Sequence, residues 1–242
     1  LHPFQTFILG QKNLAPKIAS KFGIKLIFYG ENNADHNESV SESKTSITPK
    51  IMHQYNNLKN LYLSGVKIKD LLKKHKLKYK DLQTFLPSKP KDLIDNLEIH
   101  YLGYYLKWVP QEAYYYAVEN TGFKARPFRT QGTYSKYNSI DDKIDDLHYY
   151  TTFIKYGIGR ATYDASQEIR NKHITREEGQ ALVKRFDGEF PDRYFDELMN
   201  YLDLKAEEFH HLCSEFRSPH LWKKVNGDWK LRHTVNKDGV DD

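Results

Sequence analysis

The sequence predicts an α/β fold in which a parallel sheet is followed by a mainly helical subdomain. A helical pattern over residues 5–22, closed by Gly23, runs directly into the β-branched and aromatic segment 24–29. A helix followed by a buried strand is the repeating unit of a parallel α/β sheet. From Thr175 onward, capping signals and apolar periodicity predict helices alone.

Composition narrows the class of protein. The chain has 242 residues, 39% of them hydrophobic and 14% aromatic, which excludes a wholly disordered chain. The 37 Lys and Arg against 32 Asp and Glu leave a net charge of +5, which neither requires nor excludes nucleic acid. The single cysteine, Cys213, rules out an internal disulfide and a multi-thiolate zinc site. No apolar run reaches the ~18 residues of a membrane span, so we expect a cytoplasmic protein without a membrane partner.

The end of the first predicted strand is the first candidate for a site. Gly30, Glu31 and Asn32 follow the strand directly. Ligands of parallel sheets lie at the carboxyl ends of strands, which places Glu31 and Asn32 near a site. A simple turn is the alternative, and the pattern alone favours it. The polar residues 33–49 predict a surface loop.

Residues 66–86 predict two short helices rich in lysine. Such a pair resembles a helix-turn-helix unit that binds nucleic acid. The alternative is a solvated, lysine-covered surface, which is favoured because the lysines are distributed around both helices.

Tyrosine is concentrated in the middle of the chain. Residues 101–163 hold 12 of the 18 tyrosines. Buried tyrosines usually find a partner for the hydroxyl, so a tyrosine-rich core predicts a polar interior such as a carbohydrate or nucleotide pocket. A partly hydrated interface between helices is the alternative, with equal weight.

Two helices are predicted to begin in the second half of this tyrosine-rich stretch. Ser139 and Asp142 form a capping box that opens the first helix, and Gly157 ends it. A second helix then runs from Arg160 to Ile169. Glycines before a helix can hold an anion on free backbone N–H groups, and Arg160 would add a bidentate donor. A plain helix connection is the alternative, and the weak glycine signal favours it.

Three more helices are predicted near the C-terminus. The first follows a capping box at residues 175–178, the second starts with Pro191 at its first position and ends at Leu202, and the third covers residues 206–216. Four residues of the metal-ligand type lie close by: His210, His211, Cys213 and His220. Adjacent histidines point about 100° apart on a helix, so we expect structural roles for them and no metal site.

Four segments in order resemble one known family. They are residues 104–112, 132–137, 158–164 and 174–179, and together they resemble the N-acetyl sugar amidotransferases, which include WbpG-like and PseA-like proteins. The resemblance covers essentially the whole chain.

The resemblance implies a PP-loop ATP pyrophosphatase with an adenine nucleotide α-hydrolase-like fold. Family members use ATP and Mg²⁺ to adenylate the oxygen of an N-acetyl amide, and ammonia then displaces AMP to leave an acetamidino group. It also implies a sugar substrate of lipopolysaccharide O-antigen or of a flagellin glycan such as pseudaminic or legionaminic acid. Glutaminase and synthase-like subunits are the implied partners that supply ammonia.

The chain departs from the family at its start. The family's Ser-Gly-Gly-Lys-Asp-Ser phosphate loop and its cysteine-rich, zinc-binding segment are absent from this sequence. We therefore expect the C-terminal portion of a longer enzyme, inactive by itself. Its expected regions are the rest of the α/β nucleotide-binding domain with a polar loop (1–60), a tyrosine-rich substrate-binding region (61–165) and a helical subdomain (166–242).

The resemblance also implies roles for individual residues. Those near the nucleotide are Gly30, Glu31 and Asn32. Those that hold the sugar are Lys107, Gln111, Tyr134, Ser135 and Lys136. The cations that stabilise phosphate charge are Lys143, Lys155 and Arg160. The rival hypothesis is a helical module without catalysis, which binds nucleic acid or a partner protein.

Overall fold

The computed structural model describes residues 5–30, 45–50, 53–57, 61–63 and 65–237. The chain forms two compact units, Leu1–Trp108 and Val109–Asp242, and the boundary falls within the expected tyrosine-rich region. In the described part, every helix is too short or too polar to cross a bilayer.

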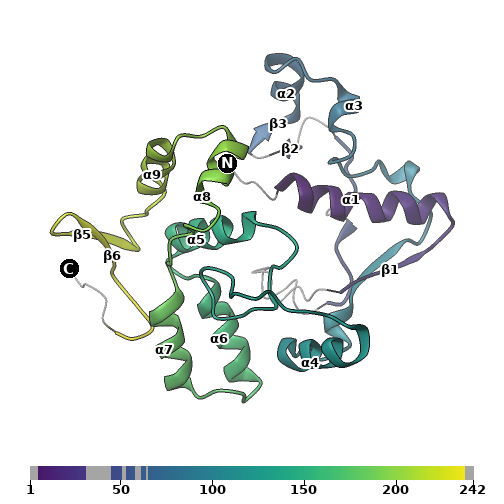
Figure 1. The fold of residues 1–242 in the computed structure, drawn as a ribbon. Coiled ribbons are helices and arrows are strands. Elements are labelled where there is room, and N and C mark those ends of the chain that lie inside the picture. The colour runs from purple at the N-terminus through teal and green to yellow at the C-terminus, as the bar shows by residue number, and fades with distance from the viewer. Residues whose placement is uncertain (1–4, 31–44, 51–52, 58–60, 64, 238–242) are drawn as a thin grey trace. The chain divides into compact units, whose positions relative to one another are not determined.

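The first unit combines helices with short strands (Figure 1). Its elements are α1 (Gln5–Lys21), β1 (Leu26–Tyr29), β2 (Tyr62–Leu63), β3 (Val66–Lys67), α2 (Ile68–Lys74), α3 (Tyr79–Leu82) and β4 (Glu98–Tyr101), with 3₁₀ turns at Pro90–Asp92 and Leu102–Tyr104. The predicted pair of short lysine-rich helices is confirmed as α2 and α3.

The predicted passage from helix to parallel strand is confirmed. Gly23 adopts a φ of +71° after α1, and the N–H of Ile24 donates to the carbonyl of Ala19 at 2.8 Å. This is the hydrogen bond of a Schellman motif, which glycine favours because it has no Cβ. The chain then enters β1, which pairs in parallel with β4 from Leu26↔Glu98 to Tyr29↔Tyr101.

The prediction that β1 is buried is wrong. Leu26 and Phe28 are each 49% exposed, because the described residues contain only the two-stranded sheet β1–β4 at this place. The α/β class is confirmed, whereas the larger parallel sheet of a PP-loop domain stays a prediction.

The second unit is mainly helical and ends in a hairpin. Its elements are α4 (Pro110–Thr121), α5 (Ile144–Tyr156), α6 (Arg160–Arg170), α7 (Arg176–Phe186), α8 (Phe195–Leu202), α9 (Ala206–Glu215), β5 (Trp222–Val225) and β6 (Asp228–Leu231). The helical subdomain is therefore confirmed, but the antiparallel pair β5–β6 contradicts the prediction of helices alone. Asn226 and Gly227 form its turn, both with positive φ, of 52° and 92°.

Predicted helix ends are confirmed where the cap is local. Gly157 ends α5 with a φ of 72°. The capping box at Thr175 opens α7, since its hydroxyl accepts the N–H of Glu178 at 3.2 Å and the Glu178 carboxylate accepts the N–H of Thr175 at 2.7 Å. The predicted cap at Ser139 is wrong, because Ser139 has a φ of 53° and α5 begins only at Ile144.

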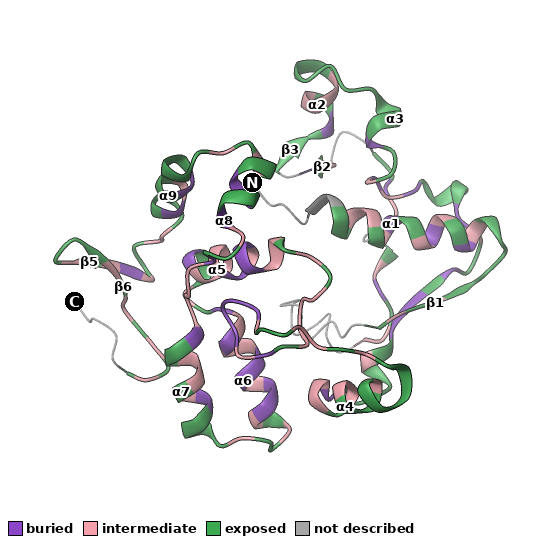
Figure 2. Cartoon of the chain, viewed as in Figure 1, coloured by how far each residue is buried: buried purple, intermediate pink, exposed green. Residues whose placement is uncertain are grey.

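The next helix also starts later than predicted. Pro191 is not at its first position, since α8 begins at Phe195. The core of the second unit lies between α5, α8 and α9, where the buried side chains include Leu147, Ile154, Leu198 and Phe209. Figure 2 shows further buried residues along α6.

Candidate functional site

Arg160, the first residue of α6, is the centre of a polar network. Its Nε donates to Oδ1 of Asp164 at 2.7 Å, and its Nη1 donates to the hydroxyl of Tyr149 at 3.0 Å. The guanidinium lies 5.1 Å from the ring centres of both Tyr149 and Tyr163. The side chain is 25% exposed, and no described residue accepts a hydrogen bond from Nη2. Arg160 can therefore offer this nitrogen to a ligand.

Asp164 anchors the network from the buried side. Its Oδ2 accepts hydrogen bonds from the Thr133 hydroxyl at 2.5 Å and from Nδ2 of Asn138 at 3.3 Å. Burial by itself lowers the pKa of the Arg160 guanidinium, but the charge of Asp164 raises it above its ordinary value. Arg160, Asp164, Tyr149, Thr133 and Asn138 are called the Arg160 network below.

The loop before α5 is tied to α6 by its backbone. The carbonyl of Gly132 accepts the N–H of Ala161 at 3.1 Å, and Gly132 has a φ of +84°. A Cβ at Gly132 would lie 3.3 Å from Cβ of Tyr149. Glycine therefore allows the loop to approach both helices and brings Thr133 to Asp164.

Two tyrosines of this loop lie close to the network. The hydroxyl of Tyr134 is buried and has no hydrogen-bond partner in the described structure. Burial, followed by the charges of Asp164 and Glu168, raises the pKa of Tyr134. Burial also raises the pKa of Tyr137 to about 12. Both phenols therefore stay neutral at physiological pH and can donate hydrogen bonds.

Helix α4 adds a second aromatic surface. The rings of Tyr114 and Tyr137 stack at 4.5 Å with an angle of 13°, and Nε2 of Gln111 donates to the Tyr115 hydroxyl at 3.4 Å. Through the stack of Tyr114 on Tyr137, the helix that carries Gln111 contacts the loop that carries Tyr134. The expectation of a largely buried tyrosine core is wrong, however, because Tyr115 and several other tyrosines are more than half exposed.

The other residues predicted to hold the sugar are Ser135, Lys136 and Lys107. Ser135 is buried, and its hydroxyl accepts the N–H groups of Tyr137 and Asn138 at 3.2 and 3.3 Å, so it stabilises the loop. The ammonium of Lys136 donates to the carbonyl of Pro127 at 3.3 Å. Lys107 belongs to the first unit.

Among the described residues, no contact joins Arg160 to the other predicted cations or to the predicted nucleotide-binding residues. Lys143 forms an exposed ion pair with Glu197 at 2.7 Å, and Lys155 lies over the ring of Tyr156 at 5.3 Å. Gly30 is at the end of β1 in the first unit. Glu31 and Asn32 lie outside the described residues.

The predicted anion site at the start of α6 is occupied by the protein's own carboxylate. Asp187 accepts the N–H groups of Gly159 and Thr162 at 3.0 and 3.1 Å. Burial raises the pKa of Asp187, while hydrogen bonds from Thr162 and Gly159 act in the opposite direction. Two amides at the start of α6 are therefore already used by a carboxylate of the protein, and Nη2 of the partly exposed Arg160 is a further group that can meet an external phosphate.

The prediction had given no role to several residues of the site. The spacing of Arg160 and Asp164 is the i, i+4 pattern of a helical ion pair, which was a usable signal. Arg129 and Glu189 form a second ion pair, in which Nη1 and Nη2 of the guanidinium donate to the carboxylate. No sequence signal pointed to this pair, because the two residues are 60 positions apart.

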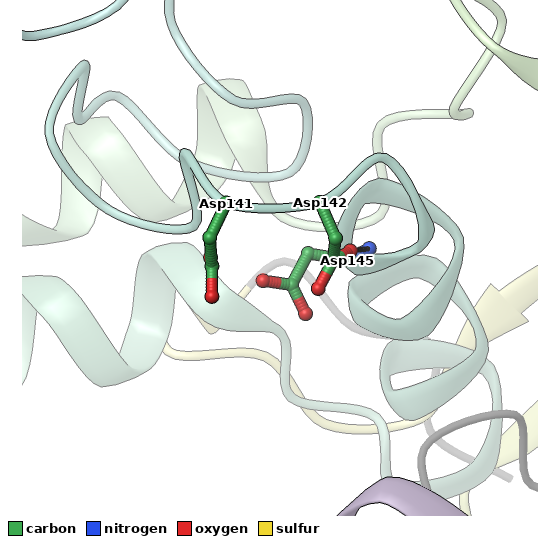
Figure 3. A group of neighbouring side chains, drawn as sticks. All are labelled: Asp141, Asp142 and Asp145. Atoms are coloured by element: carbon green, nitrogen blue, oxygen red, sulfur yellow. Dashed lines mark hydrogen bonds between the residues drawn. The ribbon is translucent and has the colours of Figure 1, made fainter.

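A group of three carboxylates lies just before and within the first turn of α5 (Figure 3). Oxygens of Asp141, Asp142 and Asp145 lie within 4.8 Å of one another, and such oxygens are ligands that Mg²⁺ accepts. Burial raises the pKa of Asp145. Nothing else in the described structure indicates an ion at this group, so we assign no metal to it.

Of the histidines and the cysteine near the C-terminus, His210 and Cys213 pack against other side chains, whereas His211 and His220 are exposed. The His210 ring stacks on Phe190 and Phe195, with centres 5.6 and 5.9 Å apart. Cys213 is buried in the core of the second unit.

Comparison with known proteins gives one match, which lies within the second unit. Residues 131–236 match the model of a protein family described as LPS biosynthesis protein WbpG-like, C-terminal domain. The matched span contains every residue of the Arg160 network. No curated protein matches the chain.

Proposed function

We propose that this chain, whose residues 131–236 match the model of the WbpG-like C-terminal domain family, is the sugar-binding part of an ATP-dependent amidotransferase of lipopolysaccharide-related biosynthesis. The observation that supports this most is the Arg160 network, which combines a partly exposed guanidinium with neutral tyrosines in the matched domain. The substrate is an N-acetylated sugar, either nucleotide-activated or nonulosonic.

The reaction replaces an amide oxygen by nitrogen. The oxygen of the acetamido group attacks the α-phosphorus of ATP, and pyrophosphate leaves. Ammonia then adds to the amide carbon, the C–O bond breaks, and AMP departs with the former amide oxygen. Loss of a proton leaves the acetamidino group. A glutaminase with a synthase-like subunit is the proposed source of ammonia.

Arg160 is the residue that we propose stabilises negative charge on phosphate in this reaction. Its Nη2 can donate to a phosphate oxygen, either of the sugar nucleotide or of the adenylated amide, while Asp164 holds Nε in place. A donor that is already oriented stabilises developing charge without reorganisation. The proposal thus requires the ion pair and not the arginine alone.

The tyrosines are the proposed sugar contacts. Their rings can cover the C–H faces of a sugar, and their hydroxyls match its hydroxyl groups. The buried hydroxyl of Tyr134 has no hydrogen-bond partner in the described structure. Buried polar groups are usually hydrogen-bonded, so we propose this hydroxyl as a donor to the sugar.

The residues of this chain offer less support for a site that binds ATP and Mg²⁺. The amides at the start of α6 are used by Asp187, and no Ser-Gly-Gly-Lys-Asp-Ser loop occurs in the sequence. We therefore assign to this chain the binding of the sugar and the stabilisation of charge.

The proposal is tested by measuring how tightly the full chain binds an N-acetylated sugar nucleotide. This measurement does not require ATP, so it tests sugar binding separately from catalysis. We expect Arg160→Ala to weaken binding by about tenfold, the effect of roughly 1.4 kcal/mol, and Arg170→Ala on the same helix to leave it unchanged. In an enzyme that contains this chain, pyrophosphate release with ATP and ammonia should fall with Arg160→Ala alone. Equal binding and equal turnover in both variants would remove Arg160 from the site.

A further inference from the structure

A pocket lies on the other side of the first turn of α6. Its volume is about 400 Å³, within the range of small-molecule sites. It is formed by the end of α5, the start of α6, helix α7 and the segment after β6. Figure 1 shows α6 and α7 side by side. We call it the α6–α7 pocket.

The α6–α7 pocket is separate from the Arg160 network. Thr162 lines the pocket and follows Arg160 by two residues. Two residues along a helix are about 200° apart, so the two side chains leave α6 on opposite faces. The pocket is therefore a second candidate site within the matched domain.

The walls of the pocket are apolar. They are formed by Phe153, Ile158, Val183, Leu231 and Val235. Ile158 is 52% and Val235 37% exposed, so apolar surface is left in contact with water at the rim. Burying this surface under a ligand is favourable.

Close backbone contacts shape the wall that Phe153 forms. Gly188 has a φ of +76°, and a Cβ at this position would lie 2.3 Å from the Phe153 ring. Glycine at 188 thus lets the ring of Phe153 lie directly against the backbone.

Polar groups lie among these walls. Thr162 donates its hydroxyl to Asp187, and the hydroxyl oxygen keeps lone pairs that can accept a hydrogen bond. Asn236 offers both an amide donor and an amide acceptor. The negative charge of Asp187 is held by hydrogen bonds from α6, and Lys184 and His233 bring basic groups to the lining. This arrangement suits a ligand with apolar faces and a polar edge.

We propose that the α6–α7 pocket binds the nucleobase of a nucleotide-activated sugar. A nucleobase is planar, has two apolar faces, and carries donors and acceptors along its edge, which matches the walls and the polar groups of the pocket. This inference rests on the proposed function, because the activated substrate supplies the nucleobase.

Titration calorimetry of the full chain with UMP, AMP and ribose 5-phosphate tests the proposal. At least one nucleotide should bind with one-to-one stoichiometry, and ribose 5-phosphate, which has no base, should not. Val183→Trp fills the pocket and should weaken nucleotide binding by at least about tenfold, or roughly 1.4 kcal/mol. Ala181→Trp places the same side chain at an exposed position of α7 and should bind as the unchanged protein does.

Three outcomes would overturn the proposal: no nucleotide binds at millimolar concentration, ribose 5-phosphate binds equally well, or Val183→Trp binds normally. If Val183→Trp does not fold, Ile158→Asn at the exposed rim makes the same test. The measurement needs neither ATP turnover nor ammonia. A negative binding result would therefore contradict the nucleobase site without contradicting the amidotransferase proposal. A lack of turnover, in turn, would not contradict the nucleobase site.

Discussion

Arg160 and Asp164 form an ion pair of 2.7 Å within one turn of α6, and the side chain of Asp164 is only 7% exposed. Three further groups complete the arrangement, since Tyr149 accepts from Arg160 and Thr133 and Asn138 donate to Asp164. The pair therefore joins α5, α6 and the loop between α4 and α5.

Removing one partner of this pair should cost stability. Asp164→Ala leaves the guanidinium of Arg160 without its carboxylate, and we expect a loss of about 3 kcal/mol in the free energy of unfolding. Urea denaturation measures it. Asp196→Ala, which changes an exposed aspartate of α8, is the control. If Asp164→Ala loses no more stability than this control, the pair is not needed for the fold.

Asp146 should make stability depend on pH. Burial raises its pKa to about 6, against the opposing charges of Arg193 and Arg126. An aspartate in the unfolded chain has a pKa of about 4. Between these values the folded protein binds more protons, so its stability falls as the pH rises from about 4 to 6. Asp146→Asn should reduce this slope in thermal unfolding curves, and an unchanged slope would contradict the assignment.

Gly188→Ala should destabilise the second unit. The residue has a φ of +76°, and a Cβ would meet the ring of Phe153 at 2.3 Å. Backbone strain and overpacking each cost about 1–3 kcal/mol. Gly227→Ala is a useful control, since its φ is also positive but no atom lies within 4 Å of the added Cβ. A lowering of the melting temperature no greater than in this control would rule out the close contact with Phe153.

The capping box of α7 should contribute a smaller amount. Thr175→Ala removes the hydroxyl that accepts the N–H of Glu178, and we expect a loss of about 1 kcal/mol in the free energy of unfolding. Thr175→Ser keeps the acceptor and should retain most of the stability. Equal losses in both variants would mean that the methyl group of threonine matters and the cap does not.

Cys213 should react slowly with thiol reagents while the protein is folded. Burial raises the pKa of its thiol to about 11, although the charge of Arg217 opposes this shift. Since the thiolate is the reactive form, modification by a disulfide reagent at pH 8 should follow unfolding in denaturant. Rapid modification of the native protein would contradict the burial of this side chain.

Some features were predictable because they depend on neighbouring residues alone. Gly23 and Gly157 take positive φ values at helix ends, a conformation that glycine adopts without a steric penalty. The hairpin turn at Asn226 and Gly227 was equally local, and the prediction missed it although this dipeptide favours such turns. Ser139 shows the limit, because its hydroxyl hydrogen-bonds to Tyr149 and does not cap α5.

The α/β class, most of the helices and the family resemblance were predictable from the sequence, because periodicity, caps and the order of segments are properties of neighbouring residues. Which groups meet depended on the packing of the folded chain. This packing brought Asp187 to the amides of α6, paired Arg129 with Glu189, and left Lys143 with Glu197. These contacts join residues 25 to 60 positions apart. The partner of a charged side chain depends on how the helices pack, which no local pattern specifies.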